Sequence, residues 1–259
     1  MNGRGLTAAT LALPLLLLAA WEAAARGFGL SALVLPPPSL IVDALWRGLA
    51  SGYFWPHLGT TALELALGLA IGAAFGLVVG VLLAELPALR RLAMPYVVVS
   101  QVVPKLALMP LLVVWFGFGL APTVLVTALI CFFPLLENTL TGLAQVAPER
   151  LELFRLLKAS RWQTLWRLKL PSGLPAVLAG LRIAVVLALV GAVVGEFVGA
   201  SRGLGALIIA AQGSMDTPLL FAVLVLVSAL GLAAYHATLW LERRLLRAYR
   251  LPLTSSTEP

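Results

Sequence analysis

The chain has 259 residues, of which 61% are hydrophobic and 11% charged, and its 18 Lys and Arg outnumber 11 Asp and Glu. Soluble domains usually carry about 25% charged residues, so the composition excludes an ordinary soluble domain and predicts one integral membrane domain over residues 1–250. A net charge of +7 would suit nucleic acid, but the basic residues lie in loops between apolar runs. Membrane topology explains that placement, so we expect no nucleic-acid partner.

A helix that crosses a membrane needs about 20 mostly apolar residues. Six stretches meet this condition and predict an all-α protein with six transmembrane helices, at about 6–25, 61–84, 95–116, 121–141, 173–196 and 218–240. The first stretch also imitates a secretory signal peptide, because Ala23-Ala24-Ala25 resembles a cleavage site. Trp21 and Glu22 interrupt that site, so we prefer an uncleaved first span.

The segment after the first span contains three consecutive prolines, Pro36 to Pro38, and then an amphipathic run from Leu40 to Leu49. Proline disrupts a helix interior but can begin a helix. We therefore expect a short helix that lies along the membrane surface on the side opposite the cytoplasm, with Ser39 as its N-cap.

The third stretch contains a cation at membrane depth. Lys105 lies about ten residues into it, or roughly 15 Å at 1.5 Å per residue, between Pro104 and Pro110. An ionisable group there is costly and marks a functional site by default, while the prolines break the helix. Lys105 either lines the translocation path and attracts an anionic substrate, or forms an ion pair with Glu64 or Glu137. We place Gln101, Pro104, Lys105 and Glu196 on the path.

Only Gly117-Phe118-Gly119-Leu120 separates the third and fourth stretches, which predicts a tight hairpin. The single cysteine, Cys131, allows no intramolecular disulfide. No phosphate-binding loop, metal-ligand pattern or paired carboxylates stand out. We therefore expect no catalytic site, no metal and no cofactor bound by this chain.

The longest polar interruption runs from Ala147 to Pro171 and holds six of the 18 Lys and Arg residues. Its apolar residues Leu151, Phe154, Leu157 and Leu165 recur at helical spacing, which predicts two short amphipathic helices broken near Ala159-Ser160. Fourteen Lys and Arg residues fall on the side of this loop and three on the other. Because cytoplasmic loops carry the excess of Lys and Arg, both termini and this loop are predicted to be cytoplasmic.

The same loop resembles the coupling loop of binding-protein-dependent ABC importer permeases. The resemblance rests on Glu152, Ala159-Ser160 and the run from Leu168 to Pro171, at the family's spacing. Leu153 and Phe154 replace two family alanines, and Lys158 replaces the glycine at which the loop turns. A lysine there must either take an uncommon backbone conformation or leave the turn one or two residues later.

Two further stretches resemble the sulfonate, taurine, nitrate and thiamine-precursor branch of these permeases. One is Pro104 to Leu111 with Trp115-Phe116-Gly117, and the other is Gly195 to Ala200 with Gly203-Leu204-Gly205. Within this second stretch, Glu196 either helps to form an outer gate or is an interfacial carboxylate that points to water.

The resemblance implies the type I importer fold, with the coupling loop between the fourth and fifth spans, in a bacterial cytoplasmic membrane. It also implies a second permease copy, two cytoplasmic ATPase subunits that hold ATP and Mg²⁺, and an extracytoplasmic substrate-binding protein. The implied substrate is a small anion such as a sulfonate, nitrate or taurine, or else a thiamine-precursor or riboflavin-like ligand. The residues expected to couple to the ATPase are Glu149, Arg150, Glu152, Arg155, Lys158, Ala159, Ser160, Arg161, Leu170 and Pro171.

Two other classes share some of these features. A secondary transporter would also use proline-broken spans and a buried lysine, but its uptake would depend on an ion gradient rather than ATP. It would not need a basic loop of this length with residues at the spacing of the importer family. A membrane enzyme would need polar residues converging at one depth, and the residues here are few and scattered. The tail from residue 251 is short and polar and is predicted to be disordered.

Overall fold

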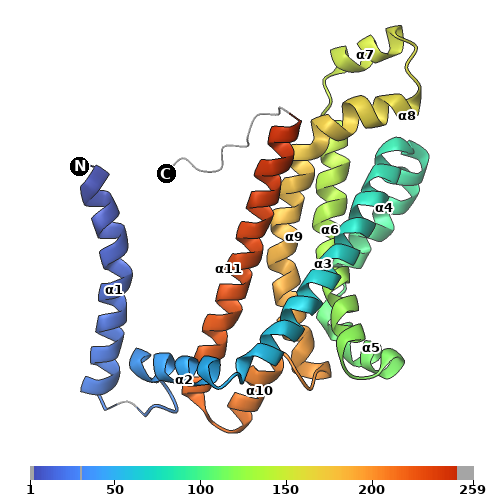
Figure 1. Ribbon diagram of the computed structural model, residues 1–259. Coiled ribbons are helices and arrows are strands. Elements are labelled where there is room, and N and C mark those ends of the chain that lie inside the picture. The colour runs from blue at the N-terminus through green and yellow to red at the C-terminus, as the bar shows by residue number, and fades with distance from the viewer. Residues whose placement is uncertain (1–2, 30, 250–259) are drawn as a thin grey trace.

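The computed structural model describes residues 3–29 and 31–249, and these form a bundle of helices (Figure 1). This confirms the all-helical prediction, whereas the tail at 251–259 lies outside the described residues. In chain order the elements are α1 (Gly3–Gly27), α2 (Pro38–Ala50), α3 (Phe54–Glu85), α4 (Pro87–Val102), the 3-10 helix η1 (Lys105–Leu108), α5 (Met109–Phe116), α6 (Leu120–Ala144), α7 (Pro148–Leu156), α8 (Arg161–Thr164), the π-helix η2 (Leu165–Lys169), α9 (Leu170–Gly199), α10 (Leu204–Gly213) and α11 (Thr217–Ala248).

Among the described residues, four helical segments are long and apolar enough to cross a membrane. They are Phe54–Glu85, Leu120–Ala144, Arg161–Gly199 and Thr217–Arg247, and they contain the second, fourth, fifth and sixth predicted spans. The first predicted span lies within α1, and its crossing of the membrane stays a prediction.

The third predicted span is not one straight helix. The segments Pro87–Val102 and Lys105–Phe116 meet at a bend of 81°. Pro104 lacks an N–H and forces the residue before it into an extended conformation, and Val103 accordingly has φ −65° and ψ 122°. The predicted break at Pro104 is therefore present, and it places Lys105 at the corner between two short helices.

The tight hairpin between α5 and α6 is confirmed. Gly117 and Gly119 have φ values of 78° and 117°, in a region that side chains with a Cβ rarely adopt. Two glycines within three residues therefore allow the chain to reverse between Phe116 and Leu120.

The core of the bundle is the contact of α3 and α9 with the central helix α6. Gly68, Gly72, Gly76 and Gly80 recur every fourth residue on α3, and a methyl group on any of them would collide with α6. Helices in a membrane gain little from the hydrophobic effect between them and associate through close packing of small residues. The glycine row therefore brings the α3 backbone against α6, which the sequence analysis above did not predict.

The helix α2 lies across the end of the bundle away from α7 (Figure 1). Its N-cap is Pro37 with Pro38 in the first turn, so the prediction of Ser39 as the N-cap is wrong. Proline fits the first helical position because that position needs no backbone donor, and the helix starts two residues earlier than predicted, at Pro38. Ser39 instead donates from its N and Oγ to the Glu22 carboxylate of α1, at 2.9 and 2.8 Å.

Candidate coupling segment and translocation path

The segment formed by α7, α8 and the turn between them projects beyond the ends of the long helices (Figure 1). In α7, Pro148 occupies the first turn and Glu149 places a negative charge there, where the helix dipole favours it. In α8, Gln163 N donates to Ser160 Oγ at 3.1 Å, and Ser160 N donates to Gln163 Oε1 at 2.8 Å. This capping box starts α8 at the predicted break near Ala159-Ser160. The second helix is longer than predicted, because α8 continues through η2 into α9.

Lys158 has a left-handed backbone, with φ 52°. Its N–H donates to Arg155 O at 2.9 Å, and Ala159 N donates to Phe154 O at 3.0 Å. These two bonds form the Schellman motif that commonly ends a helix with glycine. The sequence left open whether Lys158 adopts an uncommon backbone conformation or the turn comes one or two residues later. The structure has the uncommon conformation, and the chain turns at Lys158.

Replacing Lys158 by glycine should stabilise this turn, because a residue with a Cβ is strained by about 1 kcal/mol in the left-handed region. Amide hydrogen exchange measures the effect, and we expect slower exchange at Ala159 in Lys158→Gly than in Lys158→Ala. The alanine variant loses the same charge but keeps the Cβ. Equal exchange in the two variants would contradict the strained turn.

Most of the predicted coupling residues lie together on this exposed segment. Leu170 and Pro171 are half-buried at the start of α9, Ala159 is half-buried in the turn, and the others are exposed. Trp162 and Trp166 are also exposed, by 67% and 59%, and their rings meet edge to face at 5.9 Å. This pair was not predicted from the sequence, although its spacing of four residues in a helical segment was a usable signal.

The coupling segment is fixed to two long helices. η2 continues into α9 without a break, and its side chains Leu165 and Leu168 are buried. Lys169 Nζ donates to Glu85 Oε1 of α3 at 2.6 Å, and each of these side chains is about one-fifth exposed, 21% and 20%. The segment is thereby attached to α9 by the chain and to α3 by an ion pair.

The structure brings together three of the four predicted path residues. Pro104 is the N-cap of η1, and Lys105 Nζ donates to Gln101 Oε1 of α4 at 3.1 Å. The ion pairs found among the described residues include none between Lys105 and Glu64 or Glu137. The structure therefore does not have the ion pair that was one of the two expectations for Lys105.

Lys105 lines a cavity of about 380 Å³ between α3, α4, η1 and α6. Phe75 of α3 and Phe132 of α6 form part of its wall, with their ring centroids 5.2 Å apart. Lys105 and Ser100 are the polar residues of an otherwise apolar lining. Such a cavity can hold a small organic molecule and offers one positive charge to it.

Glu196 lies apart from this cavity, near the end of α9. Its side chain is 1% exposed, and it accepts hydrogen bonds from Thr61 Oγ1 at 2.6 Å and from Gly205 N. A carboxylate pointing to water, one of the two expectations for this residue, is therefore not observed.

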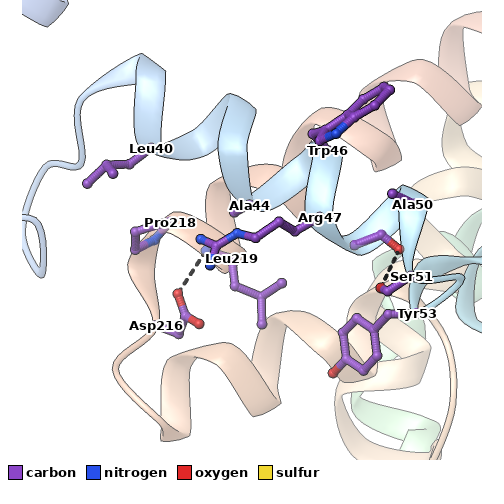
Figure 2. A pocket seen from close by; sticks show the side chains of 11 residues that line it. Leu40, Ala44, Trp46, Arg47, Ala50, Ser51, Tyr53, Asp216, Pro218 and Leu219 are labelled. Atoms are coloured by element: carbon purple, nitrogen blue, oxygen red, sulfur yellow. Dashed lines mark hydrogen bonds between the residues drawn. The ribbon is translucent and has the colours of Figure 1, made fainter.

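A second pocket, of about 770 Å³, opens at the end of the bundle opposite the coupling segment (Figure 2). Leu40, Ala44 and Arg47 from α2 face Asp216 and Pro218 at the start of α11 across it (Figure 2). Arg47 pairs with Asp43 at 2.7 Å. This pocket could not be predicted from the sequence, because about 170 residues separate the two sides of its wall.

The geometry describes a multi-pass helical bundle with an exposed basic segment at one end and a lysine that lines a cavity between its helices, as expected of a transport permease. Residues 72–247 match the family model described as the binding-protein-dependent transport system inner membrane component. The chain therefore belongs to this family, as the sequence resemblance predicted. It is a permease subunit of an ABC importer for small solutes, a multi-pass inner-membrane transport subunit rather than an enzyme.

Several named permeases resemble it over nearly their whole length. The riboflavin transport system permease RibX of Chloroflexus aurantiacus is 39% identical over 233 residues, which cover 90% of this chain and 87% of RibX. The formylaminopyrimidine transport permease ThiX of Halalkalibacterium halodurans is 37% identical, with 90% and 92% covered. The taurine transport permease TauC of Escherichia coli is 31% identical, with 88% and 85% covered.

Among solved structures, a chain of the inward-facing MetNI methionine ABC transporter superimposes with a TM-score of 0.64 at 22% identity. The match covers 76% of this chain and 98% of that chain. This likeness shows that the type I ABC importer permease fold predicted above is present.

Proposed function

We propose that this chain is the membrane-spanning half of an ATP-driven importer in a bacterial cytoplasmic membrane. Six spans cross the membrane, and both termini are cytoplasmic. A second copy pairs with it, two ATPase subunits bind ATP and Mg²⁺ below it, and an extracytoplasmic binding protein delivers the solute. The observation that carries the proposal is the exposed coupling segment, which lies at the same end as the start of α1 and the end of α11 (Figure 1).

Coupling requires that the ATPase make contacts with the permease that differ between two states. In this proposal α7 and α8 insert into a groove of the ATPase and move with it when ATP drives the two ATPase subunits together. The continuous run from η2 into α9 and the Lys169–Glu85 ion pair transmit that movement to α9 and α3. Both helices pack on α6, so the movement reorients the core of the bundle.

The cavity beside Lys105 is the proposed contact for the solute on its way through the membrane. Its volume falls within the range of small-molecule sites, and its apolar wall suits the organic part of a solute. Lys105 provides a charge-assisted donor for a sulfonate, carboxylate or carbonyl oxygen. The relatives named for riboflavin, formylaminopyrimidine and taurine transport support a small, oxygen-rich organic solute.

Replacing Lys105 by glutamine should reduce solute uptake by about tenfold, because a hydrogen bond to a charged group contributes about 1.5–3 kcal/mol. Lys105→Arg keeps the charge and should retain more of the uptake. Uptake into proteoliposomes that contain the complete transporter measures both, with the ATPase content held equal. Normal uptake by Lys105→Gln would place the solute elsewhere.

Purification of the permease from its native membranes in mild detergent tests the proposed function itself. We expect an ATPase to co-purify at two copies per permease pair, and the eluate to hydrolyse ATP. Replacing Glu152 by lysine should abolish this co-purification. A permease that purifies without an ATPase in several detergents, and takes up solute in response to an ion gradient, would support a secondary transporter instead.

A further inference from the structure

Two buried carboxyl groups meet near the end of the bundle opposite the coupling segment. Glu64 of α3 and Glu196 of α9 are each 1% exposed. Thr61, which lies three residues before Glu64 on the same face of α3, donates to Glu196 at 2.6 Å, so Glu64 faces the same part of α9. Among the described residues no lysine or arginine forms an ion pair with either of them. Buried carboxylates usually have a cation or several donors as partners, so this pair needs an explanation.

Glu196 is surrounded by donors. Thr61 Oγ1 donates to it at 2.6 Å, and the backbone N–H group of Gly205 in the first turn of α10 also donates to it. The first N–H groups of a helix have no partner within the helix, and an anion is favoured beside them. This environment suits an ionised carboxylate, so Glu196 carries the negative charge of the pair.

Glu64 has no such donors. Both of its carboxyl oxygens are buried without a donor, and its polar neighbour is the carboxyl group of Glu196, which can only accept when it is ionised. Two adjacent buried carboxylates cannot both ionise without strong repulsion. A proton on Glu64 removes the repulsion and supplies the missing donor.

The elements packed around the pair offer no other group for this role. From α6, Thr123 and Thr127 lie beside α9, and α10 contains no titratable residue. His57 and the exposed Arg202 line an open pocket at the edge of the bundle. Glu137 of α6 is half-buried but lies next to Asn138, which packs on Gly180 of α9, well away from Glu196. Lys105 donates to Gln101. Other charged groups of the adjoining helices pair elsewhere or are exposed: Asp43 with Arg47, Glu85 with Lys169, Arg182 with Glu242, and Arg90 and Arg91 at the surface.

We infer that Glu64 and Glu196 form a proton-binding site, in which the carboxylic acid of Glu64 donates to the carboxylate of Glu196. A metal ion in the same place would face the amide hydrogen that points to Glu196. No group of three or more His, Cys, Asp or Glu side chains with metal-site geometry is found within the described residues. A proton is therefore the ligand that the surrounding groups favour.

The bound proton helps to hold the turn before α10 against α3. Leu204 N donates to Thr61 Oγ1 at 2.8 Å, and Gly203 N donates to His57 Nδ1 at 3.1 Å. Together with the Glu64–Glu196 bond, these contacts hold Gly203, Leu204 and the end of α9 against one face of α3. Loss of the proton places two negative charges at the centre of this attachment and weakens it.

Infrared difference spectroscopy on the full permease complex in lipid nanodiscs tests this inference. The wild-type spectrum minus that of Glu64→Gln should show the C=O band of a protonated carboxyl group, which shifts to lower frequency in D₂O. The same subtraction with Glu149→Gln, which removes an exposed carboxylate, should show no such band.

Thermal unfolding of the same samples provides a second readout. Glu64→Gln keeps a neutral donor of the same shape, so its melting temperature should stay close to that of the wild type. Glu196→Gln removes the anion from the N–H groups of α10 and should melt several degrees lower. The proton site would be overturned if the wild type lacked the protonated-carboxyl band, or if Glu64→Gln retained it. It would also be overturned if the band were absent and Na⁺ raised the melting temperature of the wild type.

Discussion

Replacing Glu152 by lysine is expected to abolish ATP-driven uptake while the protein remains inserted in the membrane. Glu152 is exposed on α7, so its replacement disturbs no buried contact of the permease. The coupling segment already carries four cations, and the change removes a carboxylate from the surface that is proposed to dock on the ATPase. Charge reversal at an interface costs several kcal/mol, which is enough to prevent assembly with the ATPase.

Uptake by proteoliposomes and co-purification of the ATPase measure this effect together. Asp43→Lys is the matched control, because it reverses another exposed carboxylate on α2, at the end of the bundle opposite the coupling segment. A deletion within residues 152–160 should have the same effect as Glu152→Lys, since it removes the turn between α7 and α8. Retained uptake in either coupling variant, at normal membrane levels, would contradict docking through this segment.

Replacing Gly76 by isoleucine is expected to prevent the bundle from folding. A Cβ at this position would collide with Phe132 O and lie 2.8 Å from Leu135 Cβ on α6. Backbone atoms cannot move aside as a flexible side chain can, so α3 and α6 must separate. Overpacking a core costs about 1–3 kcal/mol or more, and separation of these two helices also loosens the packing of α9.

Gly59 provides a control on the same helix, because a Cβ there meets nothing within 4 Å. Gly59→Ile should therefore accumulate and elute as a single species in detergent, whereas Gly76→Ile should aggregate or be degraded. Equal yield and equal unfolding midpoints for the two variants would contradict the role assigned to the glycine row.

Much of this architecture could be predicted from the sequence because it depends on local properties. The length of an apolar run and the positions of Lys and Arg identify membrane helices and their loops. Pro104 breaks the helix of the third span whatever packs around it. Gly117 and Gly119 likewise permit the chain to reverse direction whatever their neighbours are. The left-handed Lys158 was one of two expectations, since a family glycine marked the turn.

Other features depended on atoms that are far apart in the chain. Ser39 has the chemistry of an N-cap, but the Glu22 carboxylate on α1 binds it. Lys105 could have paired with Glu64 or Glu137, but the bend at Pro104 places its ammonium beside Gln101 instead. A choice between equally suitable partners depends on distance, and distance is set by packing.

The sequence by itself determined that this protein is a helical membrane permease with a long basic loop, because hydrophobic length, charge position and the backbone limits of proline and glycine act over short stretches. Only the tertiary structure decided which glycines of α3 meet α6, and that Glu64 and Glu196, 132 residues apart in the chain, are both buried where Thr61 of α3 bonds Glu196. Close helix packing and the burial of charge are properties of pairs of surfaces, and a pair exists only after the helices have come together.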